Sequence, residues 1–435
     1  MSQKTLKLSV LAAAIAVVAG QVHSAAFQLA EQNTTGLGRA YSGEGAVADN
    51  ASVLGRNPAA MTLFDRPALS TGAVYINPEV DVEGKGAYAQ AGQASGMPTD
   101  SKDIADDAVV PFFYYVHPIN EQWVAGFGAF TNYGLATNYP NDHFAGEVAG
   151  KTSLKTLNLN PNIAFRVNNR LSLGAGLNAV YADAELVRHS GVIPAGLGPM
   201  GSVLFPEGAG TETARLAGDD WGYGWNAGLL LEADEHNRWA LTYRSEIDLT
   251  LKGDYSNGIS PLGGGLGGQA RAGSLDLTLP AIAELSGYNR VSNDWAFHYG
   301  IMWTEWSSFK ELKAVDQQGN QLLHKDENFK NSWRVSAGAT HYLNEQWTLR
   351  GGLAYDKSPV PEEYRSISIP DVDRTWYTLG ATYAYNQNLS VDAAFAFLHG
   401  KKVDVREKSE LLPAPYEFRS GGNAYLFGVQ MNYRF

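Results

Sequence analysis

The last eleven residues of the chain alternate between large apolar side chains and side chains that are mostly small or polar. One set comprises Tyr425, Phe427, Val429, Met431, Tyr433 and Phe435, and the other comprises Leu426, Gly428, Gln430, Asn432 and Arg434. Successive side chains of a strand point to opposite faces, so this segment predicts a strand with one oily face. A soluble sheet can contain one such strand, so the fold class depends on how often the pattern recurs.

The same alternation recurs along the chain. It is clearest in residues 171–181, 221–231, 295–304, 347–355, 377–385 and 389–397, where aromatic residues gather near the segment ends. Alternating apolar strands flanked by aromatic girdles are typical of bacterial outer-membrane barrels, which usually have an even number of strands. We therefore predict an all-β fold, a transmembrane antiparallel β-barrel of about fourteen strands in the bacterial cell outer membrane.

Two kinds of connection separate the expected strands. Short turns rich in Asn and Asp lie at 168–170, 234–237, 292–294, 344–345 and 386–388. Long connections lie near 85–105, 188–220, 254–274, 310–330, 357–372 and 400–415. Barrels of this class have short periplasmic turns and long external loops, so we assign the first group to the periplasm and the second to the exterior.

The first 24 residues predict an export signal. Lys4 and Lys7 precede an apolar run from Leu8 to Ala19, which is too short to span a membrane. Small residues at Val22-His23-Ser24 place the cleavage after Ser24, with a cut after Ala25 as the alternative. The signal contains two lysines and no acid, so the formal charge of −12 becomes −14 in the mature chain.

Composition excludes several classes of function. An acidic chain without a basic run is a poor binder of nucleic acid, and a chain without cysteine offers neither disulfides nor thiolate metal sites. No segment after the signal reaches the roughly 18 apolar residues of a transmembrane helix.

Residues 25–66 lack the alternation of the barrel. They are rich in small residues, and a barrel of about fourteen strands encloses more space than its own side chains fill. We expect this segment to form an N-terminal plug, or hatch, inside the lumen. Residues 67–435 then form the barrel. A disordered periplasmic tail is the alternative, although the apolar residues of the segment argue against disorder.

Several long strings resemble the FadL-type long-chain fatty-acid transporters. They are Ala26-Phe-Gln-Leu29, Gly36-Leu-Gly-Arg-Ala-Tyr-Ser-Gly-Glu-Gly-Ala-Val-Ala-Asp-Asn50, Arg56-Asn-Pro-Ala59, Phe64-Asp-Arg-Pro67, Asn132-Tyr-Gly-Leu-Ala-Thr137, Trp221-Gly-Tyr-Gly-Trp-Asn-Ala-Gly228, Leu241-Thr-Tyr-Arg-Ser-Glu246 and Arg365-Ser-Ile-Ser-Ile-Pro-Asp-Val-Asp-Arg374. The similarity runs from the signal to Phe435. It implies a fourteen-stranded barrel closed by a hatch, and passive uptake of long-chain fatty acids and similar hydrophobic molecules.

The resemblance also implies functional residues. Arg188 and Lys325 correspond to a basic pair that binds the ligand head group, although Lys313 and Lys330 lie close to Lys325. Phe27, in the first of the similar strings, corresponds to a ligand-binding position. Bound charges need partners, so a carboxylate ligand requires such cations or donors.

Two short motifs complete the expected site. Asn57, Pro58 and Ala59 should anchor the plug, with Pro58 fixing a turn and Asn57 bonding its backbone. Asn132, Tyr133 and Gly134 interrupt a strand-like stretch, and glycine inside a strand often marks a bulge or bend. A simple glycine bend would explain this stretch, whereas the resemblance implies a kinked third strand and a lateral opening into the bilayer.

External loops carry apolar residues that are costly to expose. They are Ile193, Leu197, Met200, Val203, Leu204, Phe205, Ile259, Leu262 and Leu266. Such residues suit a capture groove for an oily ligand, or they pack against one another as a cap. A groove between packed loops satisfies both interpretations.

Other functions receive less support from the sequence. Residues 263–268 match G-x-G-x-x-G without the strand–turn–helix context of a nucleotide site, and the nine histidines lack metal-ligand spacing. We expect no enzyme, no cofactor, no metal and no nucleic-acid partner, and a monomer surrounded by outer-membrane lipid and lipopolysaccharide. An aromatic-hydrocarbon channel of the same fold, a general porin and a membrane phospholipase or protease remain the alternatives.

Overall fold

Twenty strand segments form one closed antiparallel sheet in the computed structural model, which describes residues 26–409 and 412–435. The signal peptide expected at residues 1–24 lies outside this range. The segments are β1 Ala68–Gly84, β2 Ala108–Pro118, β3 Trp123–Phe130, β4 Gly134–Asn138, β5 Gly150–Arg166, β6 Leu171–His189, β7 Glu212–Glu232, β8 Asn237–Arg244, β9 Ile247–Ser256, β10 Arg271–Leu279, β11 Ile282–Arg290, β12 Trp295–Thr304, β13 Glu311–Asp316, β14 Gln321–Asp326, β15 Ser332–Tyr342, β16 Trp347–Asp356, β17 Arg374–Ala384, β18 Leu389–Gly400, β19 Val403–Glu407 and β20 Tyr416–Arg434.

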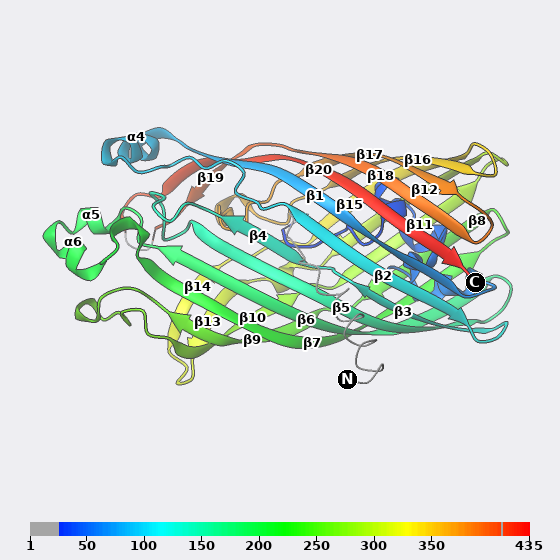
Figure 1. Cartoon of the computed structure of the whole chain (residues 1–435), viewed down its shortest axis with the longest axis horizontal. Coiled ribbons are helices and arrows are strands. Elements are labelled where there is room, and N and C mark those ends of the chain that lie inside the picture. Colours follow the sequence, from blue (N-terminus) through cyan, green and yellow to red (C-terminus); the bar gives the residue numbers. More distant parts are fainter. Residues whose placement is uncertain (1–25, 410–411) are drawn as a thin grey trace, which may run out of the picture.

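These segments make fourteen barrel strands, as predicted. Six consecutive pairs are the two halves of one interrupted strand: β3 with β4, β8 with β9, β10 with β11, β12 with β13, β14 with β15, and β18 with β19. The other eight segments are whole strands. Pairing of β1 with β20, from Ala68↔Arg434 to Gly84↔Phe418, closes the ring (Figure 1).

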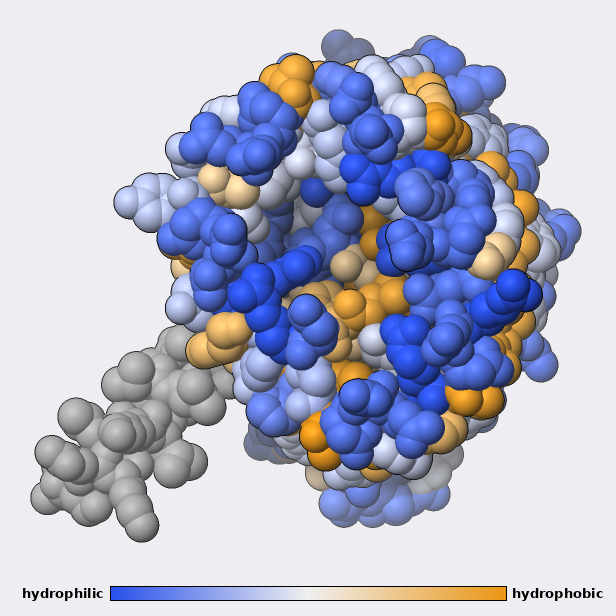
Figure 2. Space-filling model, turned by 90° about the vertical axis from the view of Figure 1, so that its right-hand side faces the viewer, coloured by the Kyte–Doolittle hydropathy of each residue, from blue (hydrophilic) through white to orange (hydrophobic). Residues whose placement is uncertain are grey.

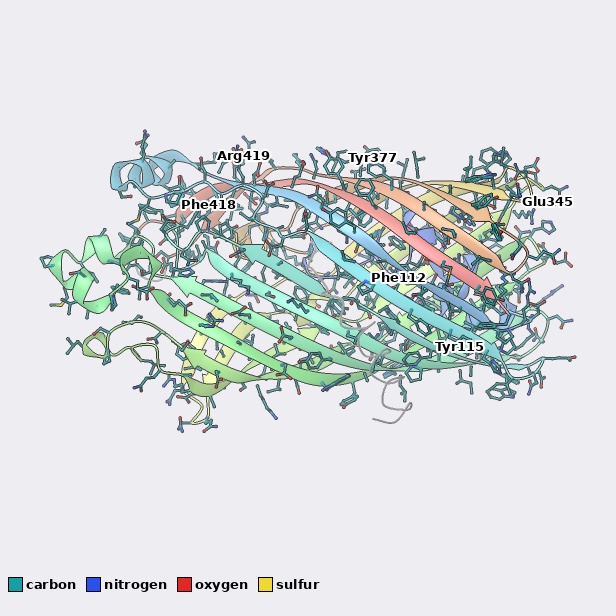
Figure 3. The ribbon with its side chains drawn as sticks, viewed as in Figure 1. Phe112, Tyr115, Glu345, Tyr377, Phe418 and Arg419 are labelled. Atoms are coloured by element: carbon teal, nitrogen blue, oxygen red, sulfur yellow. The ribbon has the colours of Figure 1, made fainter. Side chains whose placement is uncertain are left out.

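The barrel has its apolar side chains on the outside. In β12, Trp295, Phe297, Tyr299 and Ile301 are between 43% and 49% exposed, whereas the side chains between them are buried. Tyr377 of β17 belongs to the same outer surface (Figure 3). The predicted alternation is therefore confirmed, with the oily face outward as a bilayer requires.

The two ends of the barrel differ, as the connection lengths suggest. The end that carries the C-terminus has short connections, including the turn with Glu345 (Figures 1 and 3). These connections span 119–122, 167–170, 233–236, 291–294, 343–346 and 385–388. The other end carries the helices α4 Gly86–Ser95, α5 Ile193–Gly196 and α6 Pro199–Leu204, and the short 3-10 helices η3 Gly208–Gly210, η4 Pro261–Gly263 and η6 Glu362–Tyr364. The 3-10 helix η5 Trp306–Ser308 lies in the interruption between β12 and β13.

Some of the expected long loops are shorter than predicted. The connection expected at 188–220 spans 190–211, and that at 254–274 spans 257–270. The loop expected at 310–330 contains the hairpin of β13 and β14, and that at 400–415 contains β19. The connection at 139–149 was missed. The strands extend further outward than the alternation predicts. Their outer ends were not recognised because they lack the long apolar alternation of the bilayer belt.

Residues 26–66, here called the hatch segment, lie inside the barrel near the end with short turns (Figure 1). They form α2 Thr34–Leu37, α3 Glu44–Val47, η1 Ala51–Gly55 and η2 Pro58–Leu63. Figure 2 views this end, where a mostly hydrophilic rim surrounds a central hollow that contains hydrophobic residues. In the part of the chain that the structure describes, no helix is long and apolar enough to cross a membrane.

The hatch segment is bonded to the barrel wall by polar contacts. Ser42 Oγ lies 2.7 Å from Nδ1 of His298 in β12, and Asp49 pairs with Arg350 of β16 at 3.0 Å. At Gly38, the hatch backbone approaches the wall so closely that an added Cβ would lie 2.7 Å from the Cα of Gly380. Glycine is required at such a close approach.

Candidate functional site

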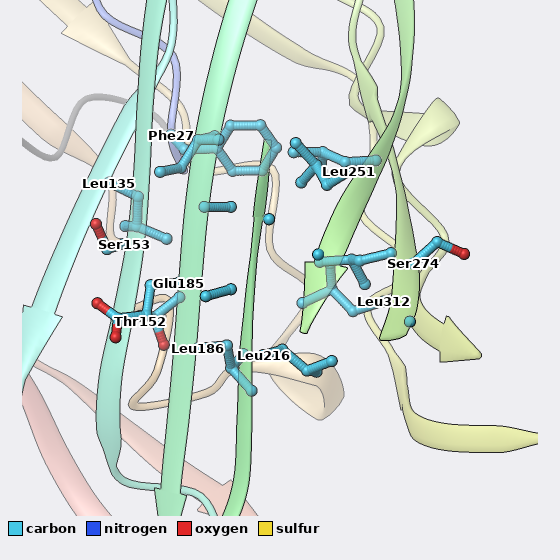
Figure 4. Close-up of a pocket in the computed structure, with 18 of the residues that line it drawn as sticks. Phe27, Leu135, Thr152, Ser153, Glu185, Leu186, Leu216, Leu251, Ser274 and Leu312 are labelled. Carbon is cyan, nitrogen blue, oxygen red and sulfur yellow. The ribbon is translucent and has the colours of Figure 1, made fainter. Parts of the chain in front are cut away.

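An apolar cavity lies in the barrel wall and lumen on the outer side of the hatch segment (Figure 4). It encloses about 650 Å³, part of it open to solvent. Apolar side chains from seven strands, the hatch and two connections dominate its lining, among them Leu135, Leu251, Leu277 and Leu312. An apolar lining with few polar groups is typical of a pocket for a hydrophobic molecule.

Phe27 of the hatch segment forms one wall of this cavity (Figure 4). Its ring is 2% exposed and packs edge-on against Trp306 at 4.6 Å and Phe309 at 5.2 Å between ring centroids. The beginning of the hatch and the outer loops therefore build the cavity together. A movement of residues 26–29 would change its shape.

Arg188 lies at the outer end of β6, beside the cavity. Its guanidinium donates to the carbonyl oxygens of Lys151 and Val187 at 3.1 and 2.8 Å, and to Oγ1 of Thr152 at 3.2 Å. Thr152 itself lines the cavity. Arg188 is only 7% exposed, so the cation is held in place by its neighbours at the polar edge of an apolar space.

Lys325 lies in β14, and its side chain has both hydroxyl and carboxylate partners. Its ammonium donates to the hydroxyl oxygens of Ser366 at 2.5 Å and Ser368 at 3.0 Å. It also pairs with Glu407 at 3.0 Å and with Glu327 at 3.7 Å. Lys313 and Lys330, the neighbouring lysines that the sequence left open, are both exposed at the surface.

Two carboxylates connect the predicted cations. Glu327 and Glu407 both interact electrostatically with Arg188, and both pair with Lys325. We call these four residues the charge cluster. Sequence reasoning missed both acids, and only the proximity of Glu327 to Lys325 in the chain offered a signal.

Burial has a large effect on one member of the charge cluster. Glu327 lies in the connection between β14 and β15 and is fully buried. Burial and, less strongly, the neighbouring Glu407 raise the pKa of its carboxyl, Lys325 and Arg188 oppose the shift, and the resulting pKa is about 7. The charge of the cluster therefore changes near neutral pH.

The predicted kink separates β3 from β4. Asn132 accepts a backbone bond from Leu29 at 2.7 Å, and the Gly134 N–H donates to the carbonyl of Phe27 at 2.8 Å. The Tyr133 hydroxyl donates to the Pro280 carbonyl at 2.6 Å. The start of the hatch segment is thus paired, like a short extra strand, with the inner side of the kink.

The wall beside the kink has an unpaired interval. β3 pairs with β2 only as far as Ala129↔Phe113, and within the described chain β4 pairs with β5 alone. Residues 108–112 of β2 consequently have β1 as their one ladder neighbour. A backbone bond of 2.8 Å from Asn138 N–H to Ile104 bounds the interval on the outer side. We call this interval, between residues 108–112 and 131–138, the open seam.

Asn57, Pro58 and Ala59 begin η2 at the middle of the hatch. The Asn57 side chain accepts from the Ala59 N–H at 3.0 Å and donates to the Gly45 carbonyl at 2.7 Å. Pro58 occupies the first helical turn, where its missing N–H costs nothing. Asn57 therefore caps one hatch helix and fastens it to α3.

The outer loops combine packed and exposed apolar residues. The Ser260 N–H donates to the Leu204 carbonyl at 2.8 Å, which joins the two loops that the sequence singled out. Phe205 is buried at 7%, whereas Met200 and Leu262 are 57% and 82% exposed. The loops form a partial cap that still presents apolar surface.

One surface cluster has metal-ligand chemistry. Glu311, His324 and Asp326 of the β13–β14 hairpin offer ligand atoms within 4.8 Å of one another. His324 Nε2 lies 2.8 Å from Glu311 Oε2, so ordinary pairing across the hairpin accounts for this cluster.

Comparison with known proteins agrees with this architecture. Residues 15–435 match the family described as outer membrane protein transport protein (OMPP1/FadL/TodX). The chain is 46% identical over 458 residues to the long-chain fatty acid transport protein of Escherichia coli O6:H1, covering all of both chains. A Pseudomonas aeruginosa FadL homologue of known structure matches with a TM-score of 0.83 and 25% identity, over 94% of this chain and 100% of that one. The P. putida toluene transporter TodX matches in fold, with a TM-score of 0.67 and 18% identity over 88% and 94% of the two chains.

Proposed function

Because the chain belongs to the OMPP1/FadL/TodX family of outer membrane transport proteins, we propose that it takes up long-chain fatty acids and similar hydrophobic molecules by passive transport. The observation that carries this proposal is a buried cation beside an apolar cavity: Arg188 bonds Thr152 in the cavity lining, and two carboxylates connect Arg188 with Lys325. An apolar space with a cationic end matches an alkyl chain with a carboxylate head. The proposed activity is transport and involves no catalysis.

Energetics support a route of successive apolar sites. Each buried methylene contributes about 0.8 kcal/mol, so a long acyl chain would enter an oily cavity readily and would leave it slowly. The exposed apolar loop residues supply a first capture groove, and the cavity supplies the next site. Release then requires a change in the cavity, and Phe27 is the part of its wall that belongs to the movable hatch.

The open seam supports lateral release. Backbone hydrogen bonds join Phe27 and Leu29 to the kink and cover the inner side of the open seam. Displacement of residues 26–29 would therefore open the cavity towards the seam. Asn57, Pro58 and Ala59 hold the centre of the hatch during such a movement. An acyl chain that leaves sideways enters the bilayer without crossing water.

Arg188→Ala tests the ligand class. It should weaken oleate binding by about 1–3 kcal/mol, the contribution of a hydrogen bond to a charged group, and leave binding of a neutral alkane of similar length unchanged. Lys325→Ala should behave similarly. The matched control is Arg215→Ala, which removes a half-exposed arginine from the outer end of neighbouring β7. Unchanged oleate affinity in Arg188→Ala would contradict the proposal.

An aromatic-hydrocarbon channel is the second candidate, supported by the likeness in fold to the toluene transporter. A neutral hydrocarbon makes no use of the charge cluster. Native mass spectrometry of ligand retained by the purified barrel separates the candidates: a bound acyl chain favours fatty acids, a bound aromatic favours the second candidate, and an empty barrel with high ion conductance favours a porin.

A further inference from the structure

Two smaller cavities lie within the barrel between the hatch segment and the wall. One encloses about 230 Å³ and is lined by Tyr41, Met302 and Arg334, among others. The second encloses about 290 Å³ and is lined by Gln32, Asn132 and Arg244, among others. Arg56 and Glu284 line both. We call them the inner cavities.

Some hydrogen-bond donors of the arginines that line the inner cavities have no acceptor among the described residues. Arg56 is 9% exposed in its side chain and contacts Glu284 only at 3.4 Å, through one of its terminal nitrogens. Its Nε and its other terminal nitrogen have no hydrogen-bond acceptor among residues 26–409 and 412–435, and neither does Nε of Arg334. Buried guanidinium N–H groups without acceptors are costly, so this site favours an incoming oxygen ligand.

The third arginine that lines the inner cavities, Arg244, is bonded to the hatch. Arg244 of β8 donates to the Gly55 carbonyl at 2.7 Å and bonds the Asn178 side chain. It thereby positions the residue directly before Arg56. Arg56 lies between η1 and η2, immediately before the Asn57 cap. Its place depends on the hatch, while Arg334 and Glu284 belong to the wall.

One cluster of buried apolar side chains extends from the large cavity to the inner cavities. Ile282 and Met302 belong to the same buried apolar cluster as Phe27 and Leu135, which line the large cavity. Ile282 also lines one inner cavity, and Met302 lines the other. An alkyl chain along this cluster keeps its tail in apolar surroundings while its head reaches Arg56.

We propose that the inner cavities form a second, internal carboxylate site, in which Arg56 and Arg334 bind the head group of the fatty acid after it leaves the charge cluster. The ligand class rests on the proposed function. Most of this volume is too narrow for a water molecule, so entry of a carboxylate requires the hatch, which carries Arg56, to shift. Asn132, the first residue of the kink, lines one cavity, so the head group is held directly beside the open seam.

The test compares a charged and a neutral ligand. In the double variant Arg56→Met with Glu284→Gln, both charges disappear together, so no lone buried charge remains. Uptake of oleate by cells, relative to wild type, should fall about 10-fold, while uptake of oleyl alcohol changes less than about twofold. Arg56→Lys should retain most oleate uptake. Oleate binding at the charge cluster of the purified protein should stay at the wild-type level.

The matched control removes an ion pair of the wall whose arginine also contacts the hatch. Arg166 donates to the Thr62 carbonyl at 2.6 Å and pairs with Glu232 at 3.2 Å, and neither residue lines the inner cavities. Arg166→Met with Glu232→Gln should lack the selective loss of oleate uptake. Heat-modifiable migration in gels reports folding of every variant.

The other outcomes overturn the inference in distinguishable ways. Equal losses of oleate and oleyl alcohol uptake would show that Arg56 only fastens the hatch. Wild-type uptake of both would show that the inner cavities hold water alone. Failure of the wild-type protein itself to bind and take up oleate would overturn the proposed function together with this site, whereas the first two outcomes leave the proposed function intact.

Discussion

Two seams of the barrel differ in how completely their strands pair. The closing seam joins β1 and β20 through an unbroken register from Ala68↔Arg434 to Gly84↔Phe418. The open seam, between β2 and the β3–β4 strand, stops pairing at Phe113↔Ala129. The seam that joins the two ends of the barrel chain is thus the continuous one, and the interruption lies between strands that are neighbours in sequence.

This difference shows that the interruption is built into the chain. Residues 131–133 turn β4 away from β2, and the hatch segment supplies the two backbone bonds that β4 and the kink would otherwise lack. Unsatisfied backbone groups are costly in a bilayer, so the hatch bonds stabilise the open seam. The closing seam needs no such support.

Deleting residues 27–60 should produce the largest effect. The barrel should still insert, because the closing seam and every other strand pairing remain. Ion conductance in planar bilayers should rise by at least about fivefold, since a lumen of fourteen strands without its plug is filled by water. High-affinity uptake should be lost. Wild-type currents together with wild-type uptake would show that the segment does not act as a plug.

Gly134→Arg tests the open seam directly. A Cβ at this position would lie 3.0 Å from Leu29 Cδ1, so the long side chain enters the space between kink and hatch. Oleate uptake should fall about 10-fold, equivalent to roughly 1.4 kcal/mol added to the exit barrier, with oleate binding unchanged.

Gly134→Ala is the matched control for this experiment. Its single methyl group meets only the flexible end of Leu29 and should preserve transport. Normal uptake by correctly folded Gly134→Arg protein would exclude lateral release at this position.

A smaller effect should distinguish ligand capture at the charge cluster from ligand exit through the open seam. Below pH 7 the Glu327 carboxyl, with its pKa of about 7, is neutral and does not compete with an anionic ligand for Arg188 and Lys325. Above pH 7 its negative charge competes for them, while the ligand carboxylate, with an ordinary pKa near 4.3, is ionised throughout. Oleate affinity should therefore fall roughly threefold between pH 6 and pH 8.

Glu327→Gln should abolish this pH dependence, and the exposed Glu363→Gln should retain it. Calorimetric titration of oleate at both pH values measures the change. A pH dependence that persists in Glu327→Gln would assign it to another group. The conductance of both variants should stay at the wild-type level, because neither seam is altered.

Much of the fold was predictable because a lipid-facing strand must alternate. Seven of the strands were located by this pattern, and the number of strands was predicted as about fourteen. β13, β14 and β19 were missed because they extend beyond the apolar belt, where the outward-facing residues of a strand are polar. The hatch was recognised by the absence of alternation.

The site was less accessible to sequence reasoning. Arg188 and Lys325 were located through resemblance, whereas Glu407 lies 82 residues after Lys325 and meets it only when the ring closes. The unpaired interval at the kink likewise depends on the register of two strand pairs, which no local motif encodes.

The pairing of β1 with β20 also has a consequence for biogenesis. The ring cannot close until the last strand, which ends at Arg434, has been delivered, because β20 supplies a ladder partner to both β1 and β18. A chain cut short before Tyr416 would face lipid with two bare strand edges, at a cost of several kcal/mol for each unsatisfied backbone group. Closure of the barrel therefore depends on β20, and a chain that lacks this strand cannot form the closed ring.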